Sequence, residues 1–159
     1  MPSAFRRKRN RLPPKVYRGA GAYSLTLACA HRKTAFADKG LAESCIETLR
    51  TCAESHGFAV LAYCFMPDHV HLLIEGGDGS DVPRFVKDFR QRTGYEYRRA
   101  TGETLWQKSY YDHVLRKEED LREAARYVVG NPVRAGLVVA AEDHPYSGSF
   151  AWSEAIMEA

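Results

Sequence analysis

The stretch FAVLAYCFMPDHVHLLIE, residues 58–75, decides the expected fold because it contains two strand candidates separated by a very short turn. Residues 58–66 form a continuous apolar run, which is typical of a buried strand. Pro67 and Asp68 are residue types that favour a turn. A second apolar run of strand length begins at His69. We therefore expect an antiparallel hairpin in the middle of the chain.

The segments on either side of this hairpin complete a recognisable order of elements. Before it lie a strand candidate at residues 23–30 and an amphipathic helix candidate at residues 39–57. After it lie a second amphipathic helix, residues 82–99, and a strand candidate at residues 105–115. The order strand, helix, strand, strand, helix, strand is that of the ferredoxin-like βαββαβ arrangement. We expect an α+β domain with one antiparallel sheet and its helices packed on one face.

A third helix is expected after this six-element core. The segment DLREAARYVVGN, residues 120–131, has Asp120 and Glu123 at the spacing of a capping box. Gly130 and Pro132 favour an end to the helix. We therefore divide the chain into an N-terminal arm (1–18), a single domain (19–150) that includes the added helix, and a C-terminal tail (151–159).

The composition limits the class of protein. The chain has 159 residues, of which 45% are hydrophobic, enough for one folded domain with a real core. No run approaches the roughly 18 apolar residues that a membrane span needs, and no signal peptide is evident. The four cysteines contain no CxxC pair, so we interpret them as reduced core thiols of a cytoplasmic protein.

The positive charge is concentrated at the N-terminus. Residues 1–18 contain seven of the 23 basic residues and no acidic residue, whereas the remaining 16 basic and 20 acidic residues give a charge of −4. Such an arm is typical of contact with phosphates, although a solvated tail has the same composition. The arm residues that we expect to contact nucleic acid are Arg6, Arg7, Lys8, Arg9 and Arg11.

The second helix carries another basic group, interleaved with Tyr95 and Tyr97. Cations beside exposed aromatic rings suit the backbone and stacked bases of a nucleic acid. The alternative is an ordinary solvated helix face. The candidates for DNA contact on this helix are Arg84, Lys87, Arg90 and Arg98.

His69 and His71 flank a single valine in the second strand of the hairpin. Residues two apart in a strand project from the same face of the sheet, so the two imidazoles should lie together. Neutral imidazoles with converging lone pairs suit a divalent cation. The alternative is a pair of histidines at a partly exposed strand start, each bound to water or backbone. A cation site also needs at least one further ligand.

The third helix offers the missing chemical groups. Tyr127 and Asn131 are four residues apart and therefore share a helix face. An amide oxygen can bind a hard cation, and a phenol can act as a nucleophile. Two structural alternatives stay open: Tyr127 as a core or groove aromatic, and Asn131 as the cap of a following turn that starts at Pro132.

Two motifs carry a resemblance to a known family. MPDHVHLLI (residues 66–74) and ARYVVGNPVRAGLV (residues 125–138) resemble the REP-associated tyrosine transposases, which belong to the single-tyrosine HUH transposases. HUH denotes histidine, hydrophobic residue, histidine. The resemblance extends from about residue 17 to residue 150. It implies that His69, His71 and Asn131 are metal ligands and that Tyr127 is the nucleophile.

One position departs from the family pattern. Asp68 stands where we expect asparagine. Because it lies in the turn, we expect its side chain to point away from the histidine face. Two other arrangements stay open, in which its carboxylate approaches the metal or holds the second nitrogen of a histidine.

The resemblance also implies an activity and its requirements. The expected reaction is cleavage and rejoining of single-stranded DNA near hairpins, through a 5′-phosphotyrosine and with Mg²⁺ or Mn²⁺. The expected partner is single-stranded DNA with hairpins, with no membrane, and the expected protein is a monomer or homodimer in the bacterial cytoplasm. Two alternatives are a catalytically silent nucleic-acid-binding module of the same fold and a metal-dependent hydrolase that uses water.

Overall fold

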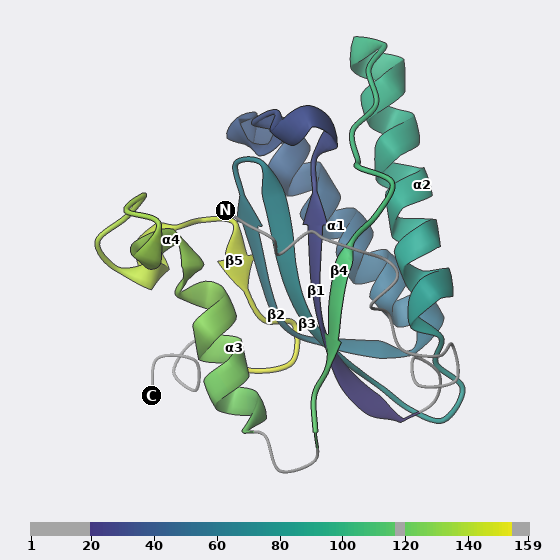
Figure 1. Cartoon of the computed structure of the whole chain (residues 1–159), viewed down its shortest axis with the longest axis vertical. Helices are drawn as coiled ribbons and strands as arrows, with labels where there is room; N and C mark the ends of the chain where they lie inside the picture. Colours follow the sequence, from purple (N-terminus) through teal and green to yellow (C-terminus); the bar gives the residue numbers. More distant parts are fainter. Residues whose placement is uncertain (1–19, 117–119, 154–159) are drawn as a thin grey trace.

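The structure, a computed structural model, describes residues 20–116 and 120–153 (Figure 1). The strands are β1 (Gly21–Ala28), β2 (Phe58–Met66), β3 (His69–Gly76), β4 (Tyr111–Val114) and β5 (Ser147–Gly148). The α-helices are α1 (Lys39–His56), α2 (Val82–Thr101), α3 (Leu121–Val129) and α4 (Asn131–Arg134). Short 3₁₀ turns occupy Ala30–Arg32, Ala35–Ala37 and Ala141–Asp143.

The strands form one antiparallel sheet in the order β4-β1-β3-β2-β5. β2 and β3 pair as the predicted hairpin, with Met66 opposite His69. The crossover through α1 leaves one strand position between β1 and β2, and β3 fills it. This arrangement of the first four strands confirms the predicted ferredoxin-like core, and the short β5 extends the sheet beyond β2.

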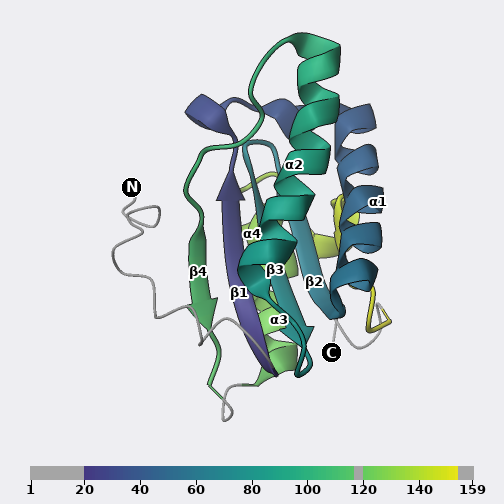
Figure 2. The ribbon, with the colours of Figure 1, turned by 90° about the vertical axis from the view of Figure 1, so that its right-hand side faces the viewer.

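Helices α1 and α2 pack together over one face of the sheet (Figure 2). Asp38 caps the start of α1 by accepting a hydrogen bond from the Leu41 amide, and Gly57 ends the helix with a left-handed φ of 73°. The main core lies between these helices and the sheet, and its large buried side chains include Leu25, Leu27, Leu49, Leu72, Ile74, Phe85 and Phe89.

Helix α3 covers the opposite face of the sheet, where it packs against β2 and β3 (Figure 2). A second, smaller core forms there, in which Ala125 and Val128 of α3 meet Cys64 and Leu73 of the sheet. The expectation that the core helices lie on one face is met by α1 and α2, while the added helix makes the fold a three-layer structure. Asp120 caps α3 through the amides of residues 122 and 123.

Two element boundaries differ from the sequence prediction. The strand expected at residues 105–115 is reduced to β4, because Trp106 turns into the core and donates its Nε1–H to Thr93 at 2.8 Å. The helix expected at residues 120–131 ends at Val129, and α4 begins directly at Asn131. Pro132 lies in the first turn of α4, where its missing amide hydrogen costs no helical hydrogen bond.

The remaining general expectations have separate outcomes. The four cysteines are free and buried, as predicted. Among residues 20–116 and 120–153, no helix has both the length and the apolar character that crossing a membrane requires. The basic residues Arg6, Arg7, Lys8, Arg9 and Arg11 lie outside the described residues, so their role stays a prediction.

Candidate active site

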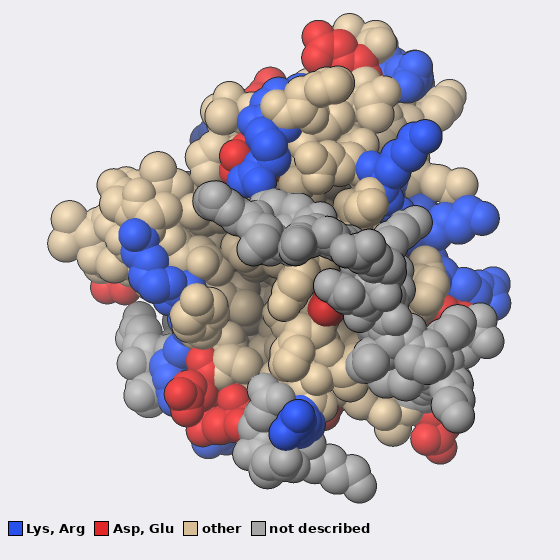
Figure 3. Space-filling view, in the orientation of Figure 1, with Lys and Arg blue, Asp and Glu red and all other residues tan. Residues whose placement is uncertain are grey.

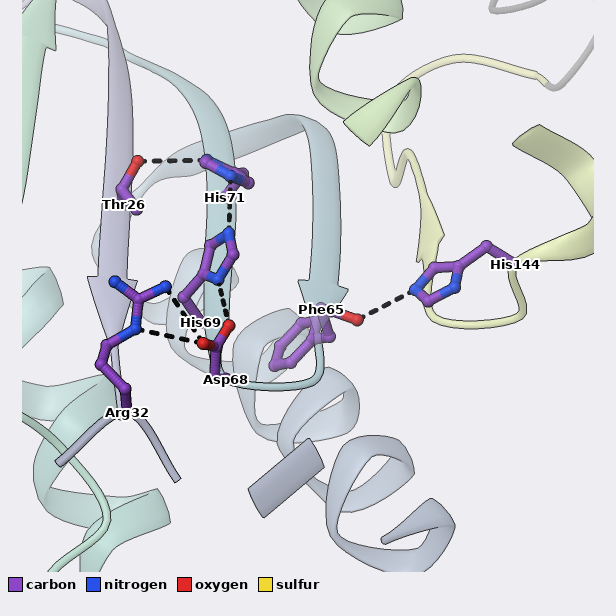
Figure 4. A network of polar contacts seen from close by, with 7 residues as sticks. All are labelled: Thr26, Arg32, Phe65, Asp68, His69, His71 and His144. Carbon is purple, nitrogen blue, oxygen red and sulfur yellow. Dashed lines mark hydrogen bonds and ion pairs between the residues drawn. The ribbon is translucent and has the colours of Figure 1, made fainter. Parts of the chain in front are cut away.

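The paired imidazoles lie on the sheet face that α3 covers. Val70 and Leu72 are fully buried in the main core on the α1–α2 side, so the alternating residues His69 and His71 point to the other side. Their Nε2 atoms are 3.0 Å apart (Figure 4). The prediction that the two side chains project together is confirmed.

Asp68 holds the outer nitrogen of His69, so the expectation that Asp68 points away from the histidines is wrong. Its Oδ1 atom accepts a hydrogen bond from His69 Nδ1 at 2.6 Å, and Arg32 contacts its Oδ2 atom at 3.1 Å (Figure 4). The turn places Asp68 at the start of β3, close enough for its short side chain to fold back onto the neighbouring ring. Burial raises the pKa of Asp68, but the hydrogen bond from His69 and the charge of Arg32 outweigh burial and leave this pKa below its ordinary value.

Thr26 of β1 holds the outer nitrogen of His71. The two residues are directly opposite in the β1–β3 register, and the hydroxyl lies 3.1 Å from His71 Nδ1. The carboxylate of Asp68 can only accept, so His69 carries its proton on Nδ1 and presents a lone pair at Nε2. In the cation-free protein, the other hydrogen bonds follow: His71 Nε2–H donates to His69 Nε2, and the Thr26 hydroxyl donates to His71 Nδ1.

Burial keeps both imidazoles neutral at pH 7. Burial lowers the pKa of His69, and the hydrogen bond to Asp68 opposes this shift only in part. Burial, followed by the nearby charges of His69 and Arg134, lowers the pKa of His71 to about 3. A neutral imidazole is the form that binds a metal ion.

The geometry of the pair fits a divalent cation. Two nitrogen ligands about 2.1 Å from one ion, at an angle near 90°, would be about 3 Å apart, which matches the observed separation of the Nε2 atoms. Outer partners that fix the ring orientation are typical of histidine ligands. In the part of the chain that the structure describes, no group of three or more His, Cys, Asp and Glu side chains could hold a metal. Among these described residues, a further protein ligand would be a side chain of another type.

Tyr127 lines a groove on the histidine side of the sheet. Its side chain is 65% exposed, so it is not sealed in a core. The groove has a volume of about 460 Å³, and Ser24 and Leu73 form part of its floor. Ser24 and Leu73 are paired across β1 and β3. Each lies two residues from the next pair on the same face, Thr26 and His71. Among the described residues, no hydrogen bond joins Tyr127 to either imidazole.

Asn131 is the first residue of α4. Its Nδ2 group donates to the Val128 carbonyl at 3.0 Å, and its Oδ1 atom accepts from Arg134 at 2.8 Å. The N-cap of α4 is Gly130, and the Asn131 side chain bonds to Val128 and Arg134 rather than to an amide of the following turn, so the capping alternative is wrong. The structure brings Asn131 next to the Tyr127 helix, and its oxygen contacts a guanidinium rather than the histidine pair.

The comparison with protein families identifies the chain. The family model of IS200-like transposases matches residues 19–131, which is most of the sequence. The chain belongs to the IS200-like transposase family. This membership accords with the resemblance seen in the two sequence motifs, and it makes the transposase a protein of DNA cleavage and transfer.

Two relatives of this transposase are named REP-associated tyrosine transposases. The one from Haemophilus influenzae is 27% identical over 143 residues, which cover 80% of this chain and 78% of the relative. The one from Escherichia coli K12 is 29% identical over 94 residues, which cover 57% of this chain and 53% of the relative.

Two solved structures share the fold of the transposase. A REP-associated tyrosine transposase bound to a REP hairpin aligns with a TM-score of 0.67 and 21% identity, over 82% of this chain and 78% of that one. A transposase from Deinococcus radiodurans R1 aligns with a TM-score of 0.54 and 23% identity, over 79% of this chain and 96% of that one. At these identities, the likeness establishes the fold.

The basic residues of α2 lie on the other side of the transposase from the histidines. Figure 3 shows lysine and arginine atoms along the edge that α2 forms. Lys87, Arg90 and Arg98 line a groove of about 490 Å³ between α2 and residues 104–108, together with the 64%-exposed Tyr95. Arg84 is exposed on the same helix. This cluster of cations and an aromatic ring has the character of a nucleic-acid surface.

Arg90 differs from the other α2 candidates because its guanidinium is used inside the protein. One of its nitrogens donates to the carbonyls of Gln107 and Lys108 at 2.9 and 2.8 Å. It therefore anchors the segment that forms the far wall of the groove. Lys108 is an exposed cation of this wall that sequence reasoning missed, since nothing in its neighbourhood predicts that residues 104–108 lie beside α2.

Proposed function

We propose that this transposase cleaves and rejoins single-stranded DNA beside hairpins, through a 5′-phosphotyrosine on Tyr127. The observation that carries the proposal is the histidine pair, with Nε2 atoms 3.0 Å apart and outer nitrogens held by Asp68 and Thr26. It faces the side of the sheet covered by the helix that bears Tyr127. The exposed phenol beside a groove is accessible to a DNA strand.

His69, His71 and Asn131 are the residues that would hold a divalent cation. Mg²⁺ or Mn²⁺, the ions that the family resemblance implies, would polarise the phosphoryl oxygens and offset the charge that develops during the reaction. Asp68 and Thr26 keep the two rings oriented so that both Nε2 lone pairs can face one point. For the second lone pair to become available, the Thr26 hydroxyl turns from donor to acceptor and His71 carries its proton on Nδ1.

Tyr127 is the nucleophile of the proposed cleavage. Its Oη atom attacks the scissile phosphorus, the Oη–P bond forms and the bond from phosphorus to the 3′-oxygen breaks. The phenol loses its proton, and the leaving oxygen takes up a proton to become a 3′-hydroxyl. The ester conserves the energy of the broken phosphodiester, so a 3′-hydroxyl from another strand can reverse the reaction. A hydrolase that uses water cannot rejoin strands in this way.

The proposed partner is single-stranded DNA that folds into a hairpin. The structural neighbour bound to a REP hairpin supports this substrate. We infer that the arm (residues 1–18) and α2 contact the DNA backbone, that residues 19–150 form the single catalytic domain and that residues 151–159 are a tail. We infer a bacterial cytoplasmic location, where the DNA is, and a monomer or homodimer as the working unit.

The test is a denaturing gel of the protein incubated with a REP-type hairpin oligonucleotide and Mn²⁺. We expect a slow-migrating protein–DNA adduct from the wild type, none from Tyr127→Phe, and none from the double variant His69→Ala with His71→Ala or after chelation. His56→Gln is the matched control, because it removes an imidazole at the end of α1, on the other face of the sheet, and a glutamine amide can still donate to Asp88. Cleavage without an adduct would support a hydrolase, and DNA binding without cleavage would support a silent module.

A further inference from the structure

Arg134 contacts both functional residues of the α3–α4 segment. Its guanidinium carbon lies 3.7 Å from the centre of the Tyr127 ring. One guanidinium nitrogen donates to Asn131 Oδ1 at 2.8 Å and to the Tyr127 carbonyl at 2.5 Å. The side chain therefore rests on the proposed nucleophile and on the oxygen of the proposed third ligand.

The charge of Arg134 is not balanced by an acidic partner. Within residues 20–116 and 120–153, no carboxylate forms an ion pair with it, and its contacts are an amide oxygen, a carbonyl and an aromatic ring. Arg32, the other arginine near the histidines, is in contrast paired with Asp68. An exposed guanidinium without a carboxylate, beside a nucleophile that attacks phosphate esters, is available to an anion.

Gly130 leaves the space in which this guanidinium lies. Its φ of −81° is ordinary for any residue, so the backbone does not require glycine there. A Cβ at this position would lie 2.9 Å from Arg134 Nη1 and 3.1 Å from the Arg126 carbonyl. A side chain at this position would therefore displace Arg134 from its place over the end of α3 and would also press on the Arg126 carbonyl.

Arg134 also lies within electrostatic range of the histidine pair. Its charge is one of the causes, after burial and the neighbouring His69, that lower the pKa of His71. It acts on the thiol of Cys64 as well, which is opposite His71 in the β2–β3 register. Its contacts with Tyr127 and Asn131 also tie the guanidinium to the helix that covers the histidine face of the sheet.

We propose that Arg134 binds the scissile phosphate, and that in the DNA-free protein its guanidinium occupies Asn131 Oδ1 and so withholds this oxygen from the cation. This inference rests on the proposed function. A phosphate is an anionic acceptor that a guanidinium can hold through two parallel hydrogen bonds, an ion pair that a neutral amide oxygen does not offer. Arrival of the DNA therefore draws the guanidinium to the phosphate, and Asn131 becomes free to bind the cation.

The first arm of the test measures Mn²⁺ binding to the DNA-free protein by isothermal titration calorimetry. Arg134→Ala frees Asn131 Oδ1 and removes a positive charge near His71, so we expect Mn²⁺ to bind about 3- to 10-fold more tightly than to the wild type. Arg122→Ala is the matched control, since it removes an exposed arginine of α3 and should leave the affinity unchanged. An unchanged or weaker affinity of Arg134→Ala would overturn the resting contact.

The second arm measures the rate of hairpin cleavage at saturating Mn²⁺. We expect Arg134→Ala to cleave about 100-fold more slowly than the wild type, as is typical when one donor to a developing oxyanion is removed. Arg134→Lys keeps the charge but not the planar fork, so its rate should fall between the two. Thermal melts of each variant verify folding, and the lysine variant carries the test if the alanine variant melts early.

The two proposals fail in different ways. If Arg134→Ala cleaves within about threefold of the wild type while Tyr127→Phe forms no adduct, the role of Arg134 is wrong and the proposed function stands. If Tyr127→Phe still forms the adduct, the proposed function itself is wrong. Tighter Mn²⁺ binding together with slower cleavage is the combination that a purely structural arginine would not produce.

Discussion

Asp68 Oδ1 lies 2.6 Å from His69 Nδ1, so an acidic side chain in the β2–β3 turn fixes the orientation of the first imidazole of β3. Arg32 reaches the same carboxylate from the 3₁₀ turn after β1, where His31 and Arg32 both have positive φ values, 57° and 53°. Two successive non-glycine residues in this region of conformational space are unusual and are typical of functional sites. The strained turn places the guanidinium of Arg32 against Asp68, the residue that orients His69.

Removal of this carboxylate should weaken cation binding. We predict that Asp68→Ala lowers Mn²⁺ affinity by about 10- to 100-fold, since His69 loses the partner that keeps its proton on Nδ1. Asp68→Asn should fall between the wild type and Asp68→Ala, because an amide oxygen still accepts but carries no charge. Calorimetric titration with Mn²⁺ measures both. Asp78→Ala, which removes an exposed loop carboxylate, is the control, and wild-type affinity in Asp68→Ala would exclude the orienting role.

The metal-free protein should lose stability as the pH falls below about 6.5. The pKa of folded His71 is about 3, so below pH 6.5 the unfolded chain binds a proton that the folded state rejects. Stability therefore falls as the pH decreases, by about 2 kcal/mol from this residue at pH 5. Urea unfolding in a chelator at pH 7 and pH 5 measures the loss. His71→Gln should lose clearly less between these pH values, and an equal loss would show that His71 is not the cause.

The α2 groove should contribute to DNA affinity and not to chemistry. We predict that the double variant Lys87→Ala with Lys108→Ala binds the hairpin several-fold more weakly and with a shallower salt dependence, since two cations no longer neutralise phosphates. Fluorescence anisotropy over a range of salt concentrations measures both effects. At saturating DNA the cleavage rate should match the wild type. Lys39→Ala, at the exposed start of α1, is the control, and equal binding by all three proteins would remove the groove from the DNA surface.

The basic arm should also contribute to the salt dependence of the DNA-binding affinity. Residues 1–15 contain six of the seven basic residues of the arm. Their deletion should weaken DNA binding and flatten the plot of log affinity against log salt by about 0.7–0.9 for each phosphate that the arm neutralises. The same anisotropy series measures this slope. If the deletion variant retains the wild-type slope, the arm is a solvated tail, which is the alternative that its composition leaves open.

The core of the fold was predictable because its signals are local. The β2–β3 hairpin follows from residues 58–75, and the alternation of side chains along a strand places His69 with His71. The side of the sheet that α3 covers was not predictable, since an amphipathic helix shows that it buries one face but not against which surface. The shortening of the expected fourth strand was not predictable either. It depends on the contact of Trp106 with Thr93 of α2, and the local sequence gives no signal of that contact.

The supporting residues of the candidate site were harder to predict than its central ones. Thr26 meets His71 through the β1–β3 register, and Arg32 meets Asp68 across 36 residues of sequence. Neither interaction has a signal in the local sequence pattern. Arg134 did have a signal, since it follows Asn131 by three residues and Tyr127 by seven, which are spacings of one helix face. The arrangement of Tyr127 and the imidazoles around one phosphate is still a proposal.

Peptide mapping of the covalent adduct tests this central claim most directly. Trypsin cleaves after Arg126 and Arg134, so Tyr127 is the only tyrosine of the peptide YVVGNPVR, residues 127–134. After reaction with a hairpin oligonucleotide and Mn²⁺, followed by nuclease trimming, we predict a 5′-linked nucleotide on this peptide, identified by mass spectrometry. A nucleotide on a different tyrosine peptide, or complete cleavage of the DNA with an unmodified 127–134 peptide, would contradict the account.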